Sequence, residues 1–505
     1  MPYFKKFSLF IAPPIAVRTV RDADKLKDTA LKNRNKILPD TEKNCNFAKN
    51  FSFYINMDHV VKIKKGLDIQ LEGAPALEIS NSTNSQLYAI IPDDFTGLTP
   101  KVDVKPGDKV LAGSPVMHDK TLTDVVVTSP VSGEVVAVER GERRKVMKIT
   151  IKPDAAQQAV EFGKVSPDTM QASDLKALLL KSGTFAFIKQ RPYDIIANPN
   201  TTPRDIFVTA FDSAPLAPDY AFVLKDEMRY LETGLKALAR LTPGKVYVGV
   251  SKRSPIEVKN GETVVFDGPH PAGNVGVQIN HIAPINKGEI VWTINALDLL
   301  FIGRLLETGH VDFSRLVAVT GAEVNKPHYV RTCAGASIAS ITQGMVKPAD
   351  YERRYISGNV LTGFNAGADG YLGARQAQVT VIPEGNNCNE FMGWASLNPH
   401  KYSMSHSYLS WLLGKKRRYD IDARIRGGER AIIMSDEYDR VFPMDIYPEY
   451  LIKAILAFDI DKMENLGIYE VAPEDFALCE FVDTSKLELQ KIVRNGLDHL
   501  MKEMN

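Results

Sequence analysis

Apolar and polar residues alternate in short stretches along the first organised part of the chain, residues 57–153. The stretch "VVVTSPVSGEVVAVERGERRKVMKITI" shows this alternation, and Gly107, Gly113 and Gly133 stand where strands must turn. A period of two residues predicts strands that bury one face. We therefore expect a domain built from short β-strands here.

The pattern changes to alternating strands and helices over residues 154–312. "DLKALLLKSG" has helical spacing and ends at Gly183, and "RDIFVTAF" and "GKVYVGV" have the apolar content of buried strands. The stretch "DYAFVLKDEMRYLETGLKALARL", which lies between those strands, is predicted to form one helix. Strands that alternate with helices favour a Rossmann-like α/β domain with a parallel sheet.

Two further units are predicted after residue 312. Residues 313–368 form a small α+β unit, and residues 369–505 form a C-terminal domain of loops and helices. The last helix is predicted to open with a capping box at Ser485 and Glu488. One face of that helix is apolar and is expected to pack on the core: Leu489, Ile492, Val493, Leu497 and Leu500.

Residues 1–56 show neither period and are rich in Asn and Lys, as in "KNRNKILPDTEKNCNFAKN". Such a composition buries little apolar surface. We interpret this segment as an extension that is disordered or lies upstream of the true start, Met57. The fold class is then α+β and α/β, with several domains.

The composition of the chain argues against several classes of function. The 505 residues are 44% hydrophobic and carry a net charge of +1, which argues against a nucleic-acid-binding protein. The four cysteines are far apart in sequence and form no C-x-x-C pair, so a local zinc or iron–sulfur site is not expected. No stretch is long and apolar enough for a membrane-spanning helix, which predicts a soluble chain.

The first domain resembles the barrel-sandwich of biotinyl and lipoyl carriers. Those carriers attach their cofactor to a lysine in a Met-Lys-Met-like tip. Counting back from Gly133 in their register reaches Leu122, and the nearest lysine, Lys120, has no methionine beside it. We therefore expect a structural or docking module, with a carrier modified on Lys120 as an alternative.

Longer stretches resemble one family. "KIKKGLDIQLEGAP", "SGTFAFIKQRPYDIIANPNTTPRDIFVTAFDSAPLAPD", "GPHPAGNVGVQINHIAPI" and "LGIYEVAPEDFALCEFVDTSK" look like the A subunits of bacterial Na+-translocating NADH:quinone oxidoreductases. The resemblance runs from about Met57 to the C-terminus. Those subunits are related to the flavoprotein subunit of complex I and to the C subunit of the Rnf complex.

Two features set this chain apart from its flavin-binding relatives. Where they carry a glycine run beside the flavin, this chain has "KSGTFAFIKQRP", in which Phe185 and Phe187 are expected to fill the space. Where they carry clustered cysteines, it has only Cys479, which we expect to be a buried free thiol.

A third stretch, within residues 313–368, resembles the β-grasp (SLBB-like) domain of these relatives.

The resemblance implies a role. The chain would be a peripheral subunit on the cytoplasmic side of the bacterial inner membrane, together with partner subunits B to F. The complex would oxidise NADH, reduce ubiquinone and export Na+. NADH, flavins and iron–sulfur centres would belong to the partner subunits, and this chain would bind no cofactor or metal, with a contact to ubiquinone left open. A flavin-binding NADH dehydrogenase subunit is the alternative.

The loop "GPHPAGNVGVQINH" supplies the candidates for a quinone contact: His270, Gly273, Gly276 and His281. His270 would donate a hydrogen bond or a proton to a quinone carbonyl, and the glycines would let the backbone close around the ring. The alternative is a tight structural turn in which His281 bonds to the backbone.

A second candidate is "EFMGWASLNPHKYSMSHSYLSWLLGKKRRYD", where aromatic residues precede a basic run. These residues would meet a partner subunit or the membrane surface: Trp394, Trp411, Lys415, Lys416, Arg417 and Arg418. A solvated charge run beside a core helix is the alternative.

Overall fold

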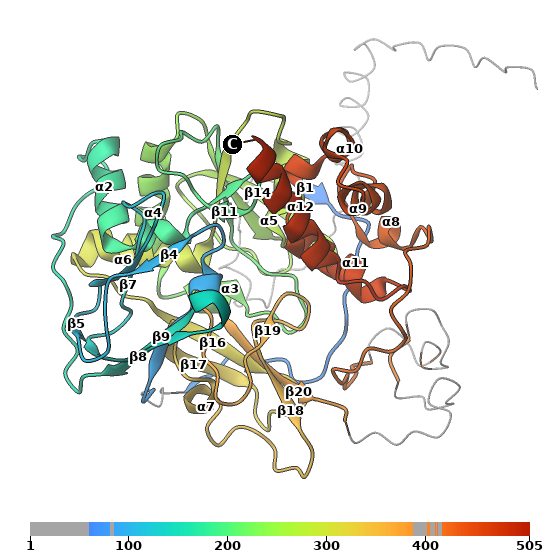
Figure 1. Ribbon diagram of the computed structural model, residues 1–505, viewed down its shortest axis with the longest axis horizontal. Helices are drawn as coiled ribbons and strands as arrows, with labels where there is room; N and C mark the ends of the chain where they lie inside the picture. Colours follow the sequence, from blue (N-terminus) through green and yellow to red (C-terminus); the bar gives the residue numbers. More distant parts are fainter. Residues whose placement is uncertain are drawn as a thin grey trace, which may run out of the picture. The chain divides into compact units, whose positions relative to one another are not determined.

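The computed structural model describes residues 60–80, 85–386, 401–403, 410, 412 and 417–504. The contacts within the chain separate residues 1–55 from residues 56–505, and every described residue belongs to the second unit. The predicted extension therefore lies outside the described residues. Figure 1 shows the arrangement of the helices and strands.

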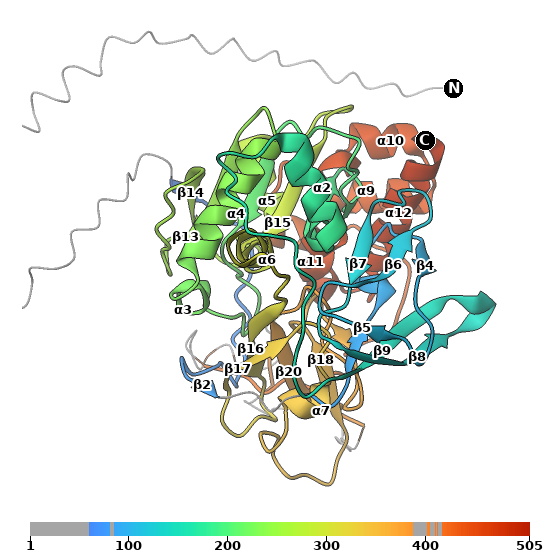
Figure 2. The same ribbon diagram turned by 90° about the vertical axis from the view of Figure 1, so that its left-hand side faces the viewer.

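Two small antiparallel sheets form most of the region from residue 85 to residue 153. Their strand orders are β3-β9-β8-β5 and β4-β6-β7 (Figure 2). The strands are β3 (Tyr88–Ile90), β4 (Pro100–Val102), β5 (Lys109–Val110), β6 (Pro115–Asp119), β7 (Val126–Thr128), β8 (Gly133–Arg140) and β9 (Val146–Pro153). Val135, Ile149 and Ile151 are fully buried, whereas Glu134 is exposed. The alternation in sequence therefore separates a core face from a solvent face.

A seven-stranded sheet forms the centre of the next region, with the order β1-β14-β13-β12-β15-β10-β11. The strands are β1 (Val60–Lys62), β10 (Lys189–Arg191), β11 (Ile195–Ile196), β12 (Ile206–Thr209), β13 (Val246–Ser251), β14 (Glu262–Asp267) and β15 (Val291–Asn295). The first five strands of this order run parallel; at one edge β10 runs antiparallel to β15, and β11 runs antiparallel to β10.

Three helices pack against this sheet, α4 (Met228–Leu241), α5 (Val275–Ile282) and α6 (Ala296–Thr308), whereas α2 (Ala172–Ser182) packs against α4 and β7. Helices α4 and α6 approach closely at two glycines. A Cβ on Gly303 would lie 1.9 Å from the carbonyl oxygen of Tyr230, and a Cβ on Gly234 would lie 2.7 Å from the side chain of Leu299. Only glycine fits such contacts.

The stretch predicted as one helix forms two. Helix α3 (Tyr220–Leu224) ends before α4 begins at Met228. Asp219 caps α3 by accepting hydrogen bonds from the main-chain N–H groups of Ala221 and Phe222, and a turn at Glu227 then separates the helices. The apolar spacing continued through this turn, which is why the pattern did not show the break. Helix α2, by contrast, ends at left-handed Gly183 as predicted.

A six-stranded sheet with the order β19-β18-β20-β16-β17-β2 forms the next region. The elements are β2 (Ile79–Ser80), β16 (Ser314–Thr320), β17 (His328–Cys333), α7 (Ile338–Ile341), β18 (Arg353–Ser357), β19 (Phe364–Asn365) and β20 (Gln378–Pro383). The segment before residue 81 therefore gives β1 to the seven-stranded sheet and β2 to this one. The predicted domain limits, including those of the domain over residues 57–153, stay predictions.

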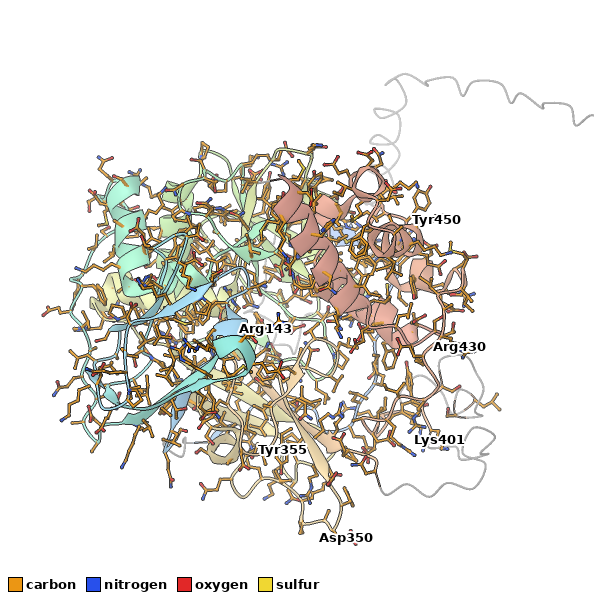
Figure 3. The ribbon with its side chains drawn as sticks, viewed as in Figure 1. Arg143, Asp350, Tyr355, Lys401, Arg430 and Tyr450 are labelled. Atoms are coloured by element: carbon orange, nitrogen blue, oxygen red, sulfur yellow. The ribbon has the colours of Figure 1, made fainter. Side chains whose placement is uncertain are left out.

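Helices and short turns make up the C-terminal part. They are α8 (Glu437–Val441), α9 (Pro448–Leu456), α10 (Ile460–Asn465), α11 (Ala477–Val482) and α12 (Leu489–Met504). Short 3₁₀ turns within the described ranges include η2 (Pro92–Asp94), η3 (Glu142–Arg144), η4 (Thr184–Phe187), η7 (Ile468–Glu470) and η8 (Pro473–Phe476). Tyr450 of α9 is 57% exposed (Figure 3).

The predicted capping box of the last helix is wrong. Helix α12 begins at Leu489, after both box residues, and the Ser485 hydroxyl instead donates to the carbonyl oxygen of Ala431 at 3.1 Å. The predicted apolar face is largely confirmed. Four of its five members are fully buried, Leu489, Val493, Leu497 and Leu500, and Ile492 is partly buried.

Candidate functional site

The candidate site lies at the carboxyl ends of β12 and β15. After β12 the chain continues to β13 and β14 on one side, and it then returns to β15 on the other side. The loops that leave β12 and β15 therefore diverge and leave a crevice between them. In open α/β sheets, ligands bind at this kind of switch in strand order.

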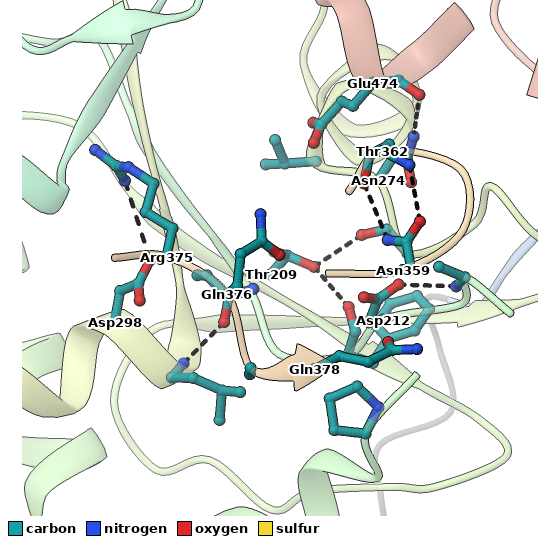
Figure 4. Close-up of a pocket in the computed structure, with 18 of the residues that line it drawn as sticks. Thr209, Asp212, Asn274, Asp298, Asn359, Thr362, Arg375, Gln376, Gln378 and Glu474 are labelled. Carbon is teal, nitrogen blue, oxygen red and sulfur yellow. Dashed lines mark hydrogen bonds and ion pairs between the residues drawn. The ribbon is translucent and has the colours of Figure 1, made fainter. Parts of the chain in front are cut away.

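A cavity of about 240 Å³ occupies this crevice (Figure 4). Three parts of the chain line it. The seven-stranded region contributes the loops after β12 and β15 and the loop that contains His270. The six-stranded region contributes Asn359, Thr362 and Arg375 to Gln378, and the C-terminal part contributes Glu474. Cavities between domains are common positions for ligand sites.

Two carboxylates stand at equivalent places in the wall. Asp212 lies three residues after the end of β12, and Asp298 lies three residues after the end of β15. Burial raises the pKa of each carboxyl group, although hydrogen bonds and nearby cations act against it. Asp212 accepts a hydrogen bond from the main-chain N–H of Ala214 at 2.8 Å, whereas Asp298 pairs with Arg315 at 3.0 Å.

Arg375 enters the same wall from the six-stranded region. Its guanidinium donates to the carbonyl oxygens of Ala186 and Phe187, at 2.6 and 2.7 Å, and lies 4.0 Å from Asp298. Burial lowers the pKa of Arg375, and the nearby carboxylates oppose that shift. This arginine therefore holds the loop after β19 against the segment that precedes β10.

A buried ion cluster forms the neighbouring wall. Arg191 is fully buried and donates to Asp475 and Glu474, at 3.1 Å in each case. Lys189 pairs with Asp194 at 3.1 Å. Burial acts to raise the pKa of Asp194, but Lys189 and Arg191 outweigh it and lower the pKa to about 2. Partial burial and the neighbouring Asp475 carboxylate raise the pKa of Glu474, whose side chain is 40% exposed, to about 7.

His270 lies in the wall of the cavity, as does Gly273. The imidazole is 2% exposed, its Nδ1 lies 3.0 Å from the Ser213 hydroxyl, and its main-chain N–H donates to Asp68. The Ser213 oxygen also accepts from the N–H of Gly273, so its hydroxyl hydrogen is available for Nδ1. His270 Nε2 is buried without a partner among the described residues. Burial lowers the His270 pKa to about 4, so the ring is neutral.

The other two residues of the predicted loop site lie apart from the cavity. Gly276, in the first turn of α5, faces the Asp475 carboxylate, and a Cβ there would lie 2.4 Å from a carboxylate oxygen. His281 is exposed near the end of α5, with its Nδ1 2.9 Å from the carbonyl oxygen of Val277. The fold thus brings His270 and Gly273 together and separates them from His281.

The second predicted site is described only in part. Trp394, Trp411, Lys415 and Lys416 lie outside the described residues. The guanidinium of Arg417 lies 5.8 Å from the centre of the Tyr419 ring, and Arg418 is exposed. Tyr419 also bonds through its backbone to the segment before β2.

The two aromatic residues of "SGTFAF" fill the interior as predicted. Phe185 packs edge-on against Trp292 at 5.5 Å, and Phe187 packs against Phe301 at 5.0 Å. Cys479 is a fully buried free cysteine, also as predicted. Lys120, the alternative attachment lysine, is exposed in the turn between β6 and β7.

Most residues of the cavity wall are not marked by a local pattern in the sequence. Asp212 and Asp298 could have been identified from the sequence, because each follows an apolar strand by the same spacing. Arg375 and Glu474 could not, since they reach the cavity from distant parts of the chain. Among the described residues, no helix is long and apolar enough to cross a membrane. The same residues hold no group of three or more His, Cys, Asp or Glu side chains placed to bind a metal ion.

Comparison with known proteins gives three domain matches. They are the NqrA N-terminal barrel-sandwich hybrid domain (residues 61–154), the NqrA second alpha/beta domain (170–311) and the NQRA C-terminal domain (316–367). The predicted mixed α/β class and the barrel-sandwich are confirmed at this level. The NAD+-reducing nickel–iron hydrogenase in the air-oxidized state aligns with 69% of this chain and 67% of its own at 12% identity, with a TM-score of 0.33, too low to carry an argument.

Relatives of known name align with most of the chain, and all three named here are A subunits of Na(+)-translocating NADH-quinone reductases. The one from Neisseria meningitidis is 36% identical over 451 residues, the one from Hahella chejuensis is 37% identical over 450, and the one from Serratia proteamaculans is 36% identical over 455. Each match covers 88% of this chain and 100% of the relative. The chain belongs to the family of A subunits of the Na+-translocating NADH-quinone reductases.

Proposed function

We propose that this chain works as the A subunit of a complex that transfers electrons from NADH to ubiquinone and couples the transfer to Na+ export. The observation that carries the proposal is the match to relatives of that name over their whole length. In this proposal the translocase activity belongs to the assembled complex, and the isolated chain is not catalytic.

The test is a deletion of this chain in its host, followed by complementation. Membranes that lack the chain are expected to lose Na+-stimulated NADH:quinone reductase activity, and membranes with the restored chain are expected to regain it. Unchanged activity in the deletion membranes would contradict the proposal.

We place the NADH, flavin and iron–sulfur sites in the partner subunits B to F. Support comes from the Phe185 and Phe187 rings, which pack against Trp292 and Phe301 in the stretch that the resemblance aligns with the glycine-rich flavin loop of flavin-binding relatives. The proposed location is peripheral, on the cytoplasmic side of the inner membrane. A flavin absorbance spectrum in the purified chain, or a biotin or lipoyl mass increase on Lys120, would favour the alternative functions instead.

The finer fold assignments belong to the same proposal. The order β14-β13-β12-β15 of parallel strands supports a Rossmann-like α/β domain. The β-grasp (SLBB-like) assignment of residues 313–368 stays a prediction from the resemblance.

We further propose that the His270 loop contacts the quinone. The neutral His270 ring has one uncommitted nitrogen, Nε2, which would donate to a quinone carbonyl after a small movement of the wall. His270→Ala in the intact complex is expected to slow quinone reduction by roughly tenfold or more while NADH oxidation by an artificial acceptor is kept. The exposed His310→Ala is the matched control. An unchanged rate of quinone reduction in His270→Ala would contradict the proposed contact between the His270 loop and the quinone.

The basic run at residues 415–418 is proposed to meet a partner subunit or the membrane surface. Reversing the charge of Arg417 and Arg418 together is expected to reduce the amount of this chain that stays with the membrane complex. Full retention of the double variant would show that the run is a solvated face.

A further inference from the structure

The cavity between β12 and β15 has walls of unequal charge. Four carboxylates line it, Asp194, Asp212, Asp298 and Glu474, against two cations, Lys189 and Arg375. Both cations are already engaged, because Lys189 pairs with Asp194 and Arg375 donates to two carbonyl oxygens. A ligand with a phosphate or carboxylate group would therefore enter a wall with no unpaired positive charge among the described lining residues.

At the N-terminus of the helix after β12, a side chain already accepts from N–H groups that would bind a phosphate. In nucleotide-binding sheets of this strand order, the phosphate sits on the free N–H groups at the start of the helix after the first strand. Here that helix is α3, and the carboxylate of Asp219 already accepts from two of its N–H groups, at 2.9 and 3.3 Å. A negative side chain thus occupies the place where a phosphate would bind.

The cavity instead presents hydrogen-bond acceptors. Asp212 accepts from main-chain N–H groups only, and no cation is paired with it among the described residues. Gln378, which is 3% exposed and lines the cavity, donates through its nitrogen and has an Oε1 without a partner there. The nitrogen of Asn274 donates to the carbonyl oxygen of Glu474, which leaves its own oxygen available. These acceptors outnumber the one unpartnered donor found in the described lining, His270 Nε2, so they call for a ligand that brings several hydroxyl or amino hydrogens and an acceptor.

We propose that this cavity binds a neutral nucleoside, with the carboxylate of Asp212 accepting hydrogen bonds from the vicinal hydroxyls of the ribose. In dinucleotide-binding sheets of this order, a carboxylate about 20 residues after the first βα turn accepts from the ribose hydroxyls; here Asp212, three residues after the end of β12, is the carboxylate that faces the crevice without a paired cation among the described residues. Gln378 and Asn274 supply acceptors for the remaining donors of the ligand. The inference goes beyond the proposed function and does not depend on it; because His270 lines the same cavity, a bound nucleoside would compete with the proposed quinone contact.

The ligand would also join three parts of the fold. Asp212 follows β12, Gln378 belongs to β20 of the six-stranded sheet, and Asn274 bonds to the C-terminal part through Glu474. A bound nucleoside would therefore hold these parts together, and binding is expected to raise the melting temperature of the whole described unit.

The test is equilibrium binding of labelled nucleosides to the purified full chain. Adenosine, uridine and cytidine are compared with 2′,3′-dideoxyadenosine and AMP. At least one ribonucleoside is expected to bind saturably. The 2′,3′-dideoxy form of that nucleoside, which lacks the two ribose hydroxyls, is expected to bind with an affinity lower by about tenfold or more. AMP is expected to bind more weakly than adenosine, because its phosphate meets the acidic walls.

Two variants separate the site from the rest of the surface. Asp212→Asn is expected to weaken ribonucleoside binding by roughly tenfold, because the hydrogen bonds to a charged acceptor are lost. Asp226→Asn makes the same chemical change at an exposed position and is expected to leave binding unchanged. The comparison of ligands on the unmodified chain still decides the question if Asp212→Asn does not fold.

Three results would overturn the proposal. They are absence of saturable binding for every ribonucleoside, equal binding of the dideoxy form, and tighter binding of AMP than of adenosine. Unchanged binding in a folded Asp212→Asn variant would overturn the assignment of the ribose to that carboxylate.

Discussion

Two buried clusters meet at residues 187–191, and they are stabilised in different ways. The aromatic cluster consists of Phe95, Phe187, Phe301 and Phe313, with ring centres 5.0 to 5.9 Å apart between Phe187 and its three partners. The ion cluster consists of Lys189, Arg191, Asp194, Glu474 and Asp475. A few residues of one segment thus supply both an apolar core and a buried network of charges.

The difference lies in how strictly each cluster depends on its partners. Apolar rings gain free energy from burial against any well-packed apolar surface, so a change of shape costs a limited amount. A buried charge must be matched by an opposite charge, and removing one partner leaves the other uncompensated. Arg191 and Asp475 are 284 residues apart in sequence, so the ion cluster ties the seven-stranded sheet to the C-terminal helices.

The largest expected effect is from Arg191→Met. The substitution leaves the buried Asp475 without its cation, and we expect the free energy of unfolding to fall by about 3–5 kcal/mol. Chemical denaturation measures it. Arg229→Met is the matched control, since Arg229 is 81% exposed in its pair with Glu307, and we expect a change within about 0.5 kcal/mol. A similar small change in Arg191→Met would mean that the ion cluster contributes little.

The second prediction concerns pH and a buried group without a paired charge. The pKa of His270 is lowered from 6.5 to about 4 by burial, so the unfolded chain takes up this proton first as the pH falls. The contribution of the neutral His270 ring to the free energy of unfolding is complete above pH 6.5. As the pH falls from 6.5 to 4, this contribution decreases by about 3 kcal/mol. Unfolding curves of His270→Gln should lack this part of the pH dependence, while His310→Gln should retain it.

Gly276→Ala tests the packing of the ion cluster against α5. A methyl group at this position would lie 2.4 Å from a carboxylate oxygen of Asp475, so either the helix or the carboxylate must shift. We expect a loss of about 1–3 kcal/mol in unfolding free energy. Gly428→Ala is the control, because a Cβ there meets nothing within 4 Å. Equal stability of the two variants would contradict the close contact.

The smallest effect is expected in the aromatic cluster. Phe187→Leu keeps an apolar side chain of similar volume, and we expect a loss of about 1 kcal/mol. The same change at the partly exposed Phe364 is the control and should cost less. A loss at Phe187 as large as that of Arg191→Met would show that ring packing is as demanding as charge pairing, and the contrast between the clusters would fail.

The sequence predicted those parts of the fold that depend on local pattern. The strands of the small sheets, helix α2 with its stop at Gly183 and the apolar face of α12 all follow from spacing along the chain. The break between α3 and α4 was missed, because Asp219 capping interrupts an apolar pattern that continues across it.

The candidate site was less predictable, because it is assembled from distant segments. His270 is one of two histidines in the glycine-containing loop that the sequence marks as a candidate, and it does lie in the cavity wall. Asp212 and Asp298 could have been found from their equal spacing after two apolar strands. Arg375 and Glu474 enter the cavity from other parts of the fold, so no local pattern marks them.

The assignment to this complex is tested by tagging the chain, purifying it from detergent-solubilised membranes and identifying the co-purifying proteins by mass spectrometry. Membrane-embedded flavoprotein subunits and an NADH-oxidising partner are expected in constant proportion to the tagged chain. Recovery of the tagged chain alone would contradict its assignment to the Na+-translocating NADH:quinone reductase complex.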